Sequence, residues 1–181
     1  IIIREDDQVV GVRMTDGDSE IVLANKSGYA IRFHESKVRE MGRMSTGVKG
    51  MTLNGGDDEI VGMIAIEDME KENIMVVSDQ GYGKRSNIDD YRITNRGGKG
   101  VKTMNITDKT GLLVAIKNVT DENDLMIINK SGVVIRLKVT DARVMGRATQ
   151  GVRLINLGKR NDQIASVCKV LTSNEEEELE I

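Results

Sequence analysis

The feature that most constrains the fold of this chain is a three-fold internal repeat. Three segments of 28 residues, 26–53, 79–106 and 130–157, align without a gap at offsets of 53 and then 51 residues. Glycine, arginine and valine recur at matched positions of all three segments. A period of about 50 residues indicates an array of structural repeats, in which each unit packs against its neighbours.

Each unit begins with the pattern of a β-hairpin. The runs 20–25, 73–78 and 124–129 are short, apolar and rich in β-branched residues, which favours strands buried on both faces. A turn that ends in glycine follows each run, and an alternating strand comes next. The middle unit breaks the alternation, because Lys84 takes a position on the apolar side of its second strand.

Two further strands are predicted in each unit. One follows a loop and has the sequence GVKGMTL, GVKTMNI or GVRLINL. The other covers 59–66, 112–119 and 163–170, with residues 8–14 as a leading copy. Four short strands per unit of about 50 residues predict an all-β, propeller-like fold of about three four-stranded blades.

Composition limits the class of protein. Aromatic residues make up 2% of the chain, so the core must be built from Ile, Val, Leu and Met. A single cysteine, Cys168, excludes an internal disulfide and suits a reducing cytoplasm. No stretch approaches the roughly 18 apolar residues of a membrane-spanning helix, and IIIRED at the start is too short for a signal peptide. Because the chain begins without Met in a run typical of mid-strand, we expect a piece of a longer protein.

The charge is distributed by repeat position. The formal net charge is −3, but the three aligned segments hold 18 of the 26 basic residues and only 6 of the 29 acidic ones. These segments therefore carry +12, and the rest of the chain carries −15. Equivalent positions of a repeat array lie along one edge or face, so the recurring cations predict a continuous positive track.

Such a track is suited to a polyanion longer than one blade, and duplex DNA is the obvious candidate. Arginine favours phosphate because its planar guanidinium holds two oxygens at once. The alternative is that these cations are merely solvated. The matched cations are Arg32, Arg85 and Arg136; Arg39, Arg92 and Arg143; Arg43, Arg96 and Arg147; and Lys49, Lys102 and Arg153.

The middle unit has a specialised loop, TNRGGKG at 94–100. Gly97 and Gly98 stand where the other units have side chains, so a phosphodiester can approach the backbone N–H groups, while Arg96 and Lys99 flank the site. A Walker-type nucleotide loop is excluded, because Lys99 is followed by Gly100 and not by Ser or Thr. A flexible turn without a ligand stays open as an alternative.

A basic, glycine-rich heptad within a repeated β unit resembles the signature box of the C-terminal domain of the DNA gyrase A subunit. That box has the form Gln, basic, Arg, Gly, Gly, basic, Gly, and five of the seven positions match: Arg96, Gly97, Gly98, Lys99 and Gly100. Thr94 and Asn95 depart from it. The phrases GYGKRS, SGVVIRL and MGRATQGVRLINL are also similar to gyrase A blades.

This resemblance implies a β-pinwheel, a propeller-like disc of usually six blades that wraps DNA around a basic rim and supports ATP-dependent negative supercoiling by the whole enzyme. On this basis residues 1–171 form the distal part of a pinwheel, with units at about 8–58, 59–111 and 112–170. Residues 172–181 form an acidic tail, predicted to be disordered. The implied partners are duplex DNA, the gyrase A breakage-reunion domain and the gyrase B subunit, in the bacterial cytoplasm at the nucleoid.

No catalytic constellation is found in the sequence. His34 is the single histidine, which leaves no triad and no histidine-based metal site. Cys168 lies in an apolar strand pattern and is expected in the core. We therefore expect no cofactor or metal in this part of the chain, with ATP and Mg²⁺ used by other domains of the whole enzyme.

Two rival functions remain at the level of sequence. One is a topoisomerase IV-type domain that binds DNA but wraps it weakly, and the other is a propeller-like scaffold whose basic face binds an acidic protein. Because blades have exposed edges, self-association through these edges is also expected.

Overall fold

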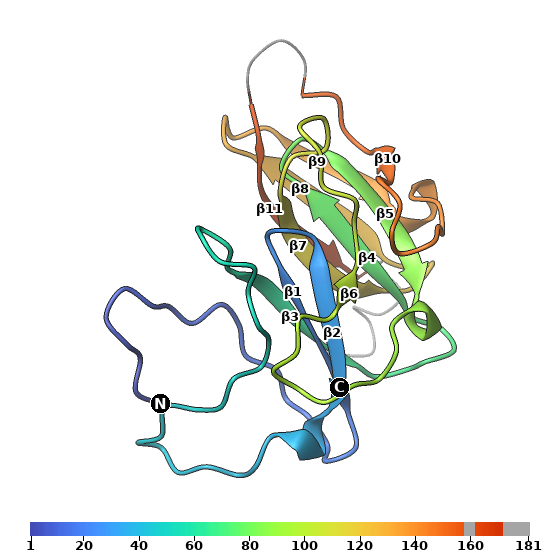
Figure 1. The fold of residues 1–181 in the computed structure, drawn as a ribbon. Helices are drawn as coiled ribbons and strands as arrows, with labels where there is room; N and C mark the ends of the chain where they lie inside the picture. Colours follow the sequence, from blue (N-terminus) through green and yellow to red (C-terminus); the bar gives the residue numbers. More distant parts are fainter. Residues whose placement is uncertain (158–161, 172–181) are drawn as a thin grey trace, which may run out of the picture.

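Three antiparallel β-sheets follow one another along the chain, as Figure 1 shows. The computed structural model describes residues 1–157 and 162–171. The first sheet contains β1 (Glu20–Asn25), β2 (Tyr29–His34) and β3 (Ile60–Ile66); the second contains β4 (Asn73–Ser78), β5 (Tyr82–Asn87) and β7 (Leu113–Val119); the third contains β8 (Asp124–Asn129), β9 (Val134–Lys138) and β11 (Ile164–Val170). A single 3-10 turn follows the second strand of each: η1 (Glu35–Lys37), η2 (Ile88–Asp90) and η3 (Val139–Asp141). The all-β fold class is confirmed.

The fourth strand of a sheet comes from the next repeat. The short strand β6 (Val101–Lys102) belongs to the second unit but pairs with β2 of the first, and β10 (Val152–Arg153) of the third unit pairs with β5 of the second. We call residues 91–106 and 142–157, which reach back in this way, and the matching residues 38–53 of the first unit, the crossing segments. Because the first and second sheets are each completed by a strand from the following unit, the blades are linked by backbone hydrogen bonds as well as by packing.

Two predicted strands are absent, and the pairing pattern explains why. The prediction for 8–14 is wrong, since these residues are exposed and irregular. The prediction for 47–53 is also wrong, since these residues form no strand, although Met51 is buried. Residues 8–14 occupy the repeat position of β3, β7 and β11, each of which pairs with the first strand of the preceding blade. Residues 47–53 lie in the first crossing segment, at the repeat position of β6 and β10. Within the described residues no blade precedes either segment, so neither has a partner strand. The third sheet likewise has three described strands instead of four.

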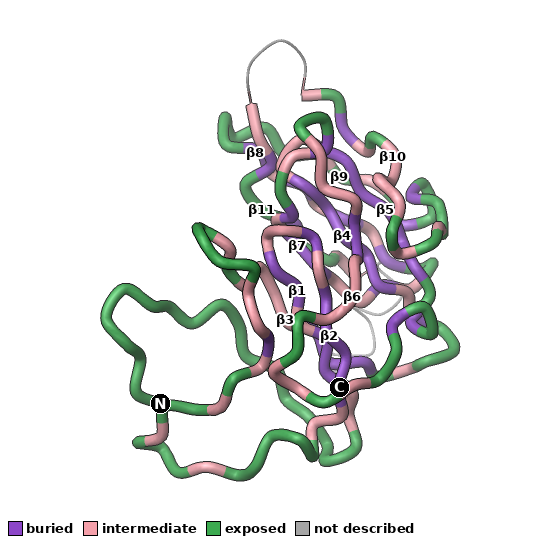
Figure 2. Tube along the Cα trace, in the orientation of Figure 1, coloured by how far each residue is buried: buried purple, intermediate pink, exposed green. Residues whose placement is uncertain are grey.

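The core lies between the sheets. Along β4, Ile74 and Val76 face the first sheet, whereas Met75 and Val77 face the third, and all four are buried. This two-sided burial is the reason that the strand is almost continuously apolar. Figure 2 shows the buried residues running through the middle strands, while the N-terminal stretch is exposed. The predicted acidic tail, 172–181, lies outside the described residues.

Two of the matched arginines hold neighbouring blades together. Arg32 is 4% exposed, forms an ion pair with Glu20, and donates from Nη1 to the carbonyl oxygens of Ile88 and Tyr91, at 3.0 Å each. Those two carbonyls belong to the next unit.

Arg85 repeats the arrangement one blade further on. Its Nε donates to the carbonyl oxygen of Ala142 at 2.7 Å, and its guanidinium pairs with Asp121. The sequence-based expectation that Arg32 and Arg85 face DNA does not fit these positions, because both guanidinium groups are enclosed by protein acceptors.

Lys84, the residue that broke the strand pattern, is a third link of this kind. It is fully buried, and its Nζ donates to the carbonyl oxygens of Gly146 and Arg147 at 2.9 and 2.6 Å and to Ser86 Oγ at 3.0 Å. The matched residues Ile31 and Ile135 make apolar contacts instead. Lys84 therefore replaces packing with hydrogen bonds at the junction of the second and third blades.

The three matched arginines allow a stability test with an internal control. We expect Arg32→Ala to lower the free energy of unfolding by about 3 kcal/mol, because it leaves Glu20 and two buried carbonyls without their partner. Arg136→Ala removes an arginine whose side chain is 54% exposed and paired with Asp124, and should cost less than about 1 kcal/mol. Urea unfolding followed by far-ultraviolet circular dichroism measures both, and equal losses would contradict the linking role.

Lys84 should also give stability a specific pH dependence. Burial lowers its pKa to about 8, below the roughly 10.4 of an exposed lysine. Between these values the unfolded chain binds more protons than the folded one, so the free energy of unfolding should rise with pH, by about 2 kcal/mol from pH 8 to 10. Well below pH 8 both states are protonated and this contribution is constant. Lys84→Met should lack the rise; parallel pH profiles of the two proteins in urea unfolding would contradict the assignment.

Candidate nucleic-acid interface

The glycine-rich loop 94–100 lies in the crossing segment of the second unit, where it is held against the first. The amide of Gly97 donates to the carbonyl oxygen of Gly50 at 2.6 Å, and the carbonyl oxygen of Gly98 accepts from the amide of Thr52 at 2.8 Å. Thr94 donates its amide to the carbonyl oxygen of Arg32 at 2.8 Å. The loop is therefore fixed at both ends to the preceding blade.

The backbone geometry requires glycine at some positions of this loop and not at others. Gly97 has a φ of 85°, which disfavours any side chain. Gly100 lies so close to the first blade that an added Cβ would be 2.1 Å from the carbonyl oxygen of Ala30. Gly98 is exposed, and an added Cβ would lie 3.5 Å from Ile31 Cδ1 and 4.0 Å from the amide nitrogen of Gly100, both ordinary contacts. Geometry thus requires glycine at 97 and 100, whereas at 98 glycine leaves the backbone bare to solvent.

Two consecutive amides at the tip of the loop are free. The N–H groups of Gly98 and Lys99 have no acceptor among residues 1–157 and 162–171, and both residues are exposed. The Lys99 ammonium has no ion pair within the same range. Free backbone donors next to a free cation are the arrangement by which a loop binds an oxyanion.

Arg96 adds positive charge to the loop and also holds the loop against the preceding unit. Its Nε donates to the carbonyl oxygen of Lys37 at 2.8 Å, and its Nη1 donates to that of Lys49 at 3.0 Å. Arg147 repeats the second contact, donating to the carbonyl oxygen of Lys102 at 2.8 Å. These matched arginines fasten each crossing segment to the one before it, a role that the sequence pattern did not reveal.

Some of the remaining predicted DNA-binding cations have partners within the protein, and others do not. Arg136 pairs with Asp124, Arg153 lies over the Tyr82 ring and donates to its hydroxyl at 2.9 Å, and the Lys102 ammonium is 3.4 Å from Asn105 Oδ1. Six exposed cations have no side-chain hydrogen bond or ion pair within the described residues. They are Arg39, Arg43, Lys49, Arg92, Lys99 and Arg143. Arg39, Arg92 and Arg143 are the same position of the three units, so free cations recur from blade to blade.

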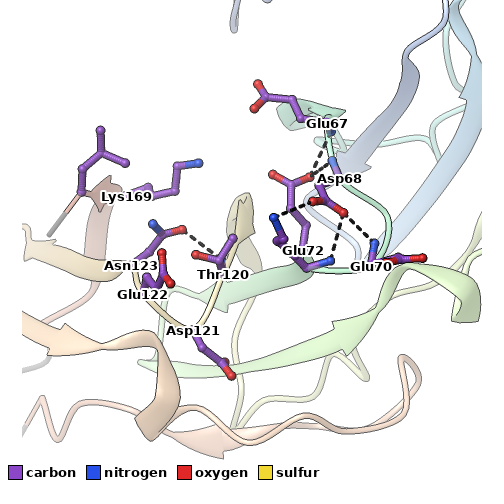
Figure 3. Close-up of a pocket in the computed structure, with 11 residues that line it drawn as sticks. Glu67, Asp68, Glu70, Glu72, Thr120, Asp121, Glu122, Asn123 and Lys169 are labelled. Carbon is purple, nitrogen blue, oxygen red and sulfur yellow. Dashed lines mark hydrogen bonds and ion pairs between the residues drawn. The ribbon is translucent and has the colours of Figure 1, made fainter. Parts of the chain in front are cut away.

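A groove between two turns, shown in Figure 3, is lined mainly by acidic side chains. Its lining includes Glu67, Asp68, residues 70–72 and residues 120–123, together with Lys169. Several of its carboxylates stabilise their own turn: Glu72 accepts from the amide of Glu67 at 3.1 Å, and Asp68 accepts from that of Glu70 at 2.9 Å. Negative charge and internal hydrogen bonding make this groove unsuited to a polyanion.

The described residues hold no cluster of side chains arranged to bind a metal ion. No group of three or more His, Cys, Asp or Glu side chains there is arranged to hold a metal ion, and His34 binds only Ser36 and Asp18. Cys168 is exposed, so the expectation that it lies in the core is wrong; β11 is at the uncovered outer sheet. None of the helices in the described part of the chain is long and apolar enough to cross a membrane.

Comparisons with known proteins agree with this geometry. A family model described as "DNA gyrase C-terminal domain, beta-propeller" matches residues 19–67, 72–120 and 123–168. The A subunit of DNA gyrase from Staphylococcus aureus (strain MRSA252) is 47% identical over 178 residues, which cover 98% of this chain and 20% of that protein. The chain thus spans about a fifth of the length of this relative.

Two solved structures have the same fold. A DNA gyrase A C-terminal domain superposes with a TM-score of 0.85 at 26% identity, covering 94% of this chain and 57% of that one. The C-terminal domain of a DNA topoisomerase IV superposes with a TM-score of 0.87 at 29% identity, covering 94% of this chain and 52% of that one.

The different tasks of the loop glycines predict different effects on stability. Gly98→Ala should change the free energy of unfolding by less than about 0.5 kcal/mol, because the new methyl group has room. Gly100→Ala should destabilise by more than about 1 kcal/mol, because φ is 76° and the methyl group meets the backbone of β2. Thermal unfolding of the two variants compares them directly, and a Gly98→Ala loss as large as that of Gly100→Ala would refute the distinction.

Proposed function

The chain belongs to the DNA gyrase C-terminal domain family, and on that premise we propose that it binds and bends duplex DNA as part of a type II topoisomerase. The observation that carries the proposal is the recurrence of free, exposed cations on the crossing segments: Arg39, Arg92 and Arg143 at one matched position, with Lys99 at the bare glycine loop. A duplex that passes over successive blades meets one such cation on each.

The contacts proposed are to the phosphate backbone. Gly98 and Lys99 offer two amide donors and an ammonium group to one phosphate, and the repeated arginines neutralise others further along. No helix or long ribbon projects from the described residues to reach base edges, so recognition rests on the backbone and on the ease of bending. The proposed interface is therefore independent of base sequence.

The proposed binding set is smaller than the sequence-based one. Arg39, Arg43, Lys49, Arg92, Lys99 and Arg143 contact DNA directly, with Gly97, Gly98 and Gly100 shaping the loop. Arg96, Lys102, Arg136, Arg147 and Arg153 add charge while they keep their internal partners. Arg32 and Arg85 are left out, because their guanidinium groups are buried.

In the whole enzyme this binding would support ATP-dependent negative supercoiling. The partners proposed there are the gyrase A breakage-reunion domain and the gyrase B subunit, with ATP and Mg²⁺ used in other domains. The proposed location is the bacterial cytoplasm, at the nucleoid. A topoisomerase IV-type domain, which binds DNA but wraps it weakly, is the second candidate, favoured by Thr94 and Asn95, which depart from the gyrase box.

Affinity for a long random-sequence duplex across a salt series tests the proposal. Each phosphate contact should contribute about −0.9 to the slope of log K against log salt, so contact with several blades predicts a steep slope without sequence preference. Lys99→Gln should weaken binding and make the slope shallower by about 0.9. Lys71→Gln, an equal change of charge in the acidic groove, should leave both unchanged. A flat salt response, or equal effects of the two variants, would favour a protein-binding scaffold instead.

A further inference from the structure

An exposed isoleucine lies in the middle of the basic surface. Between residues 59 and 111 two large apolar side chains are exposed, Met69 and Ile93. Met69 has an internal partner, since its Sδ lies 3.1 Å from Nη2 of Arg32. Ile93 is 56% exposed and belongs to none of the apolar clusters of the described residues. Its unit has a described blade on each side, so both adjoining blades are in place and leave Ile93 uncovered.

The backbone holds Ile93 in a fixed position. Ile93 forms a parallel β-bridge with Arg32 of the first blade, and the next residue, Thr94, donates its amide to the carbonyl oxygen of Arg32 at 2.8 Å. Two residues before Ile93, Tyr91 is fully buried, and its carbonyl oxygen accepts from Nη1 of Arg32 at 3.0 Å. The apolar side chain is therefore presented to solvent by a segment that is anchored on both sides.

The third unit repeats this arrangement at the matched position. Val144 is 47% exposed and forms the same parallel bridge, with Arg85. The next residue, Met145, donates its amide to the carbonyl oxygen of Arg85 at 2.8 Å, and Ala142, two residues before Val144, is fully buried. The first unit has Glu40 at this position, so the feature belongs to the second and third units. One exposed apolar side chain is ordinary on a protein surface, but its recurrence at an anchored position calls for a ligand.

A free cation precedes each of these apolar side chains. Arg92 comes directly before Ile93, and Arg143 directly before Val144. Both arginines are exposed and have no side-chain hydrogen bond or ion pair within residues 1–157 and 162–171. A guanidinium group next to an apolar side chain matches a ligand in which phosphates and apolar surface alternate. Duplex DNA is such a ligand, because each phosphate adjoins a deoxyribose.

The form of the crossing segments favours the minor groove of that duplex. The major groove is wide enough for a helix or a two-stranded ribbon. The crossing segments instead offer single side chains on short strands and irregular backbone. Proteins that bend DNA place single apolar side chains against the minor groove, where these part stacked bases and let the duplex curve. A narrow minor groove also attracts arginine through its enhanced negative potential.

We propose that Ile93 and Val144 contact the minor groove of a bent duplex as apolar wedges. Arg92 and Arg143 hold the adjacent phosphates. This inference rests on the proposed function and deepens it, because the cations supply affinity for the duplex and the wedges hold its curvature. Since the backbone of each wedge is already fixed to the preceding blade, little conformational freedom is lost on contact. Two wedges on successive blades hold the bend at two points along the duplex.

Two substitutions of similar shape at Ile93 isolate the apolar contact. Ile93→Val keeps an apolar side chain, the one that the third unit has, whereas Ile93→Thr puts a hydroxyl group in the place of a methyl group. With a long random-sequence duplex, Ile93→Thr should bind about five-fold more weakly than Ile93→Val at every salt concentration, because a polar group is buried against an apolar wall. Both should keep the salt slope of the unaltered protein, since neither removes a phosphate contact. Arg92→Gln should instead make the slope shallower by about 0.9.

Circularisation by DNA ligase measures the bend. A duplex of roughly 150 base pairs, one persistence length, seldom closes unaided. The unaltered protein at saturating concentration should raise the yield of circles, and Ile93→Thr should give fewer circles than Ile93→Val at equal saturation. Leu112→Thr is the matched control, because Leu112 is 44% exposed and directly precedes β7, at the edge of the second sheet opposite β10. It should match the unaltered protein in affinity and in circle yield.

The outcomes separate this inference from the function on which it rests. A steep salt slope for the unaltered protein, with equal affinities and equal circle yields for Ile93→Val and Ile93→Thr, would overturn the wedges and leave DNA binding in place. A flat salt response of the unaltered protein would overturn both. Equal losses for Ile93→Thr and Leu112→Thr would overturn the assignment of the contact to the crossing segments.

Discussion

The structure depends on the short strands β6 and β10, which the second and third repeats give to the blade before them. The short strands β6 and β10 form hydrogen bonds with β2 and β5 and so complete the preceding sheets. The loops that lead to β6 and β10 carry Arg96 and Arg147, which donate to carbonyl oxygens of the adjacent unit. Part of the basic character of the crossing segments therefore has a structural role. Some of these cations, such as Arg96 and Arg147, fasten adjacent units, and others at nearby positions, such as Arg92 and Arg143, extend into solvent. Architecture and charge are therefore supplied by one stretch of each repeat.

Much of the fold could be predicted from the sequence, because the repeat and the apolar runs of β1, β4 and β8 are strong local signals. The exchange between units could not, since a strand of two residues looks the same whichever sheet it joins. For that reason the sequence predicts strands at 8–14 and 47–53, although neither has a partner strand among residues 1–157 and 162–171. The resemblance of the chain to gyrase A blades did identify the family.

The candidate site was predicted less completely. Recurrence marked all twelve matched cations, but it could not separate those that face solvent from those that face carbonyls. A signal for Arg32 and Arg136 was present in the sequence, as an acidic residue, Glu20 or Asp124, stands twelve positions before each. Lys84 gave a different signal: a charged residue in an apolar position indicates a buried partner, and its partners are carbonyls 62 and 63 residues away. Acceptors that distant can be found only in three dimensions.

Strand exchange also sets the size of the cooperative unit. In an ordinary solenoid each repeat keeps its own hydrogen bonds, so that it can open alone at the cost of one interface. Here β5 cannot leave its place without also freeing β10, and the release of β10 loosens the third unit in turn. Local opening should therefore spread across two blades, and amide hydrogens of β4 and β8 should exchange by a shared, near-global event instead of blade by blade. The repeats follow one another as separate units in the sequence, but the exchanged strands couple their unfolding.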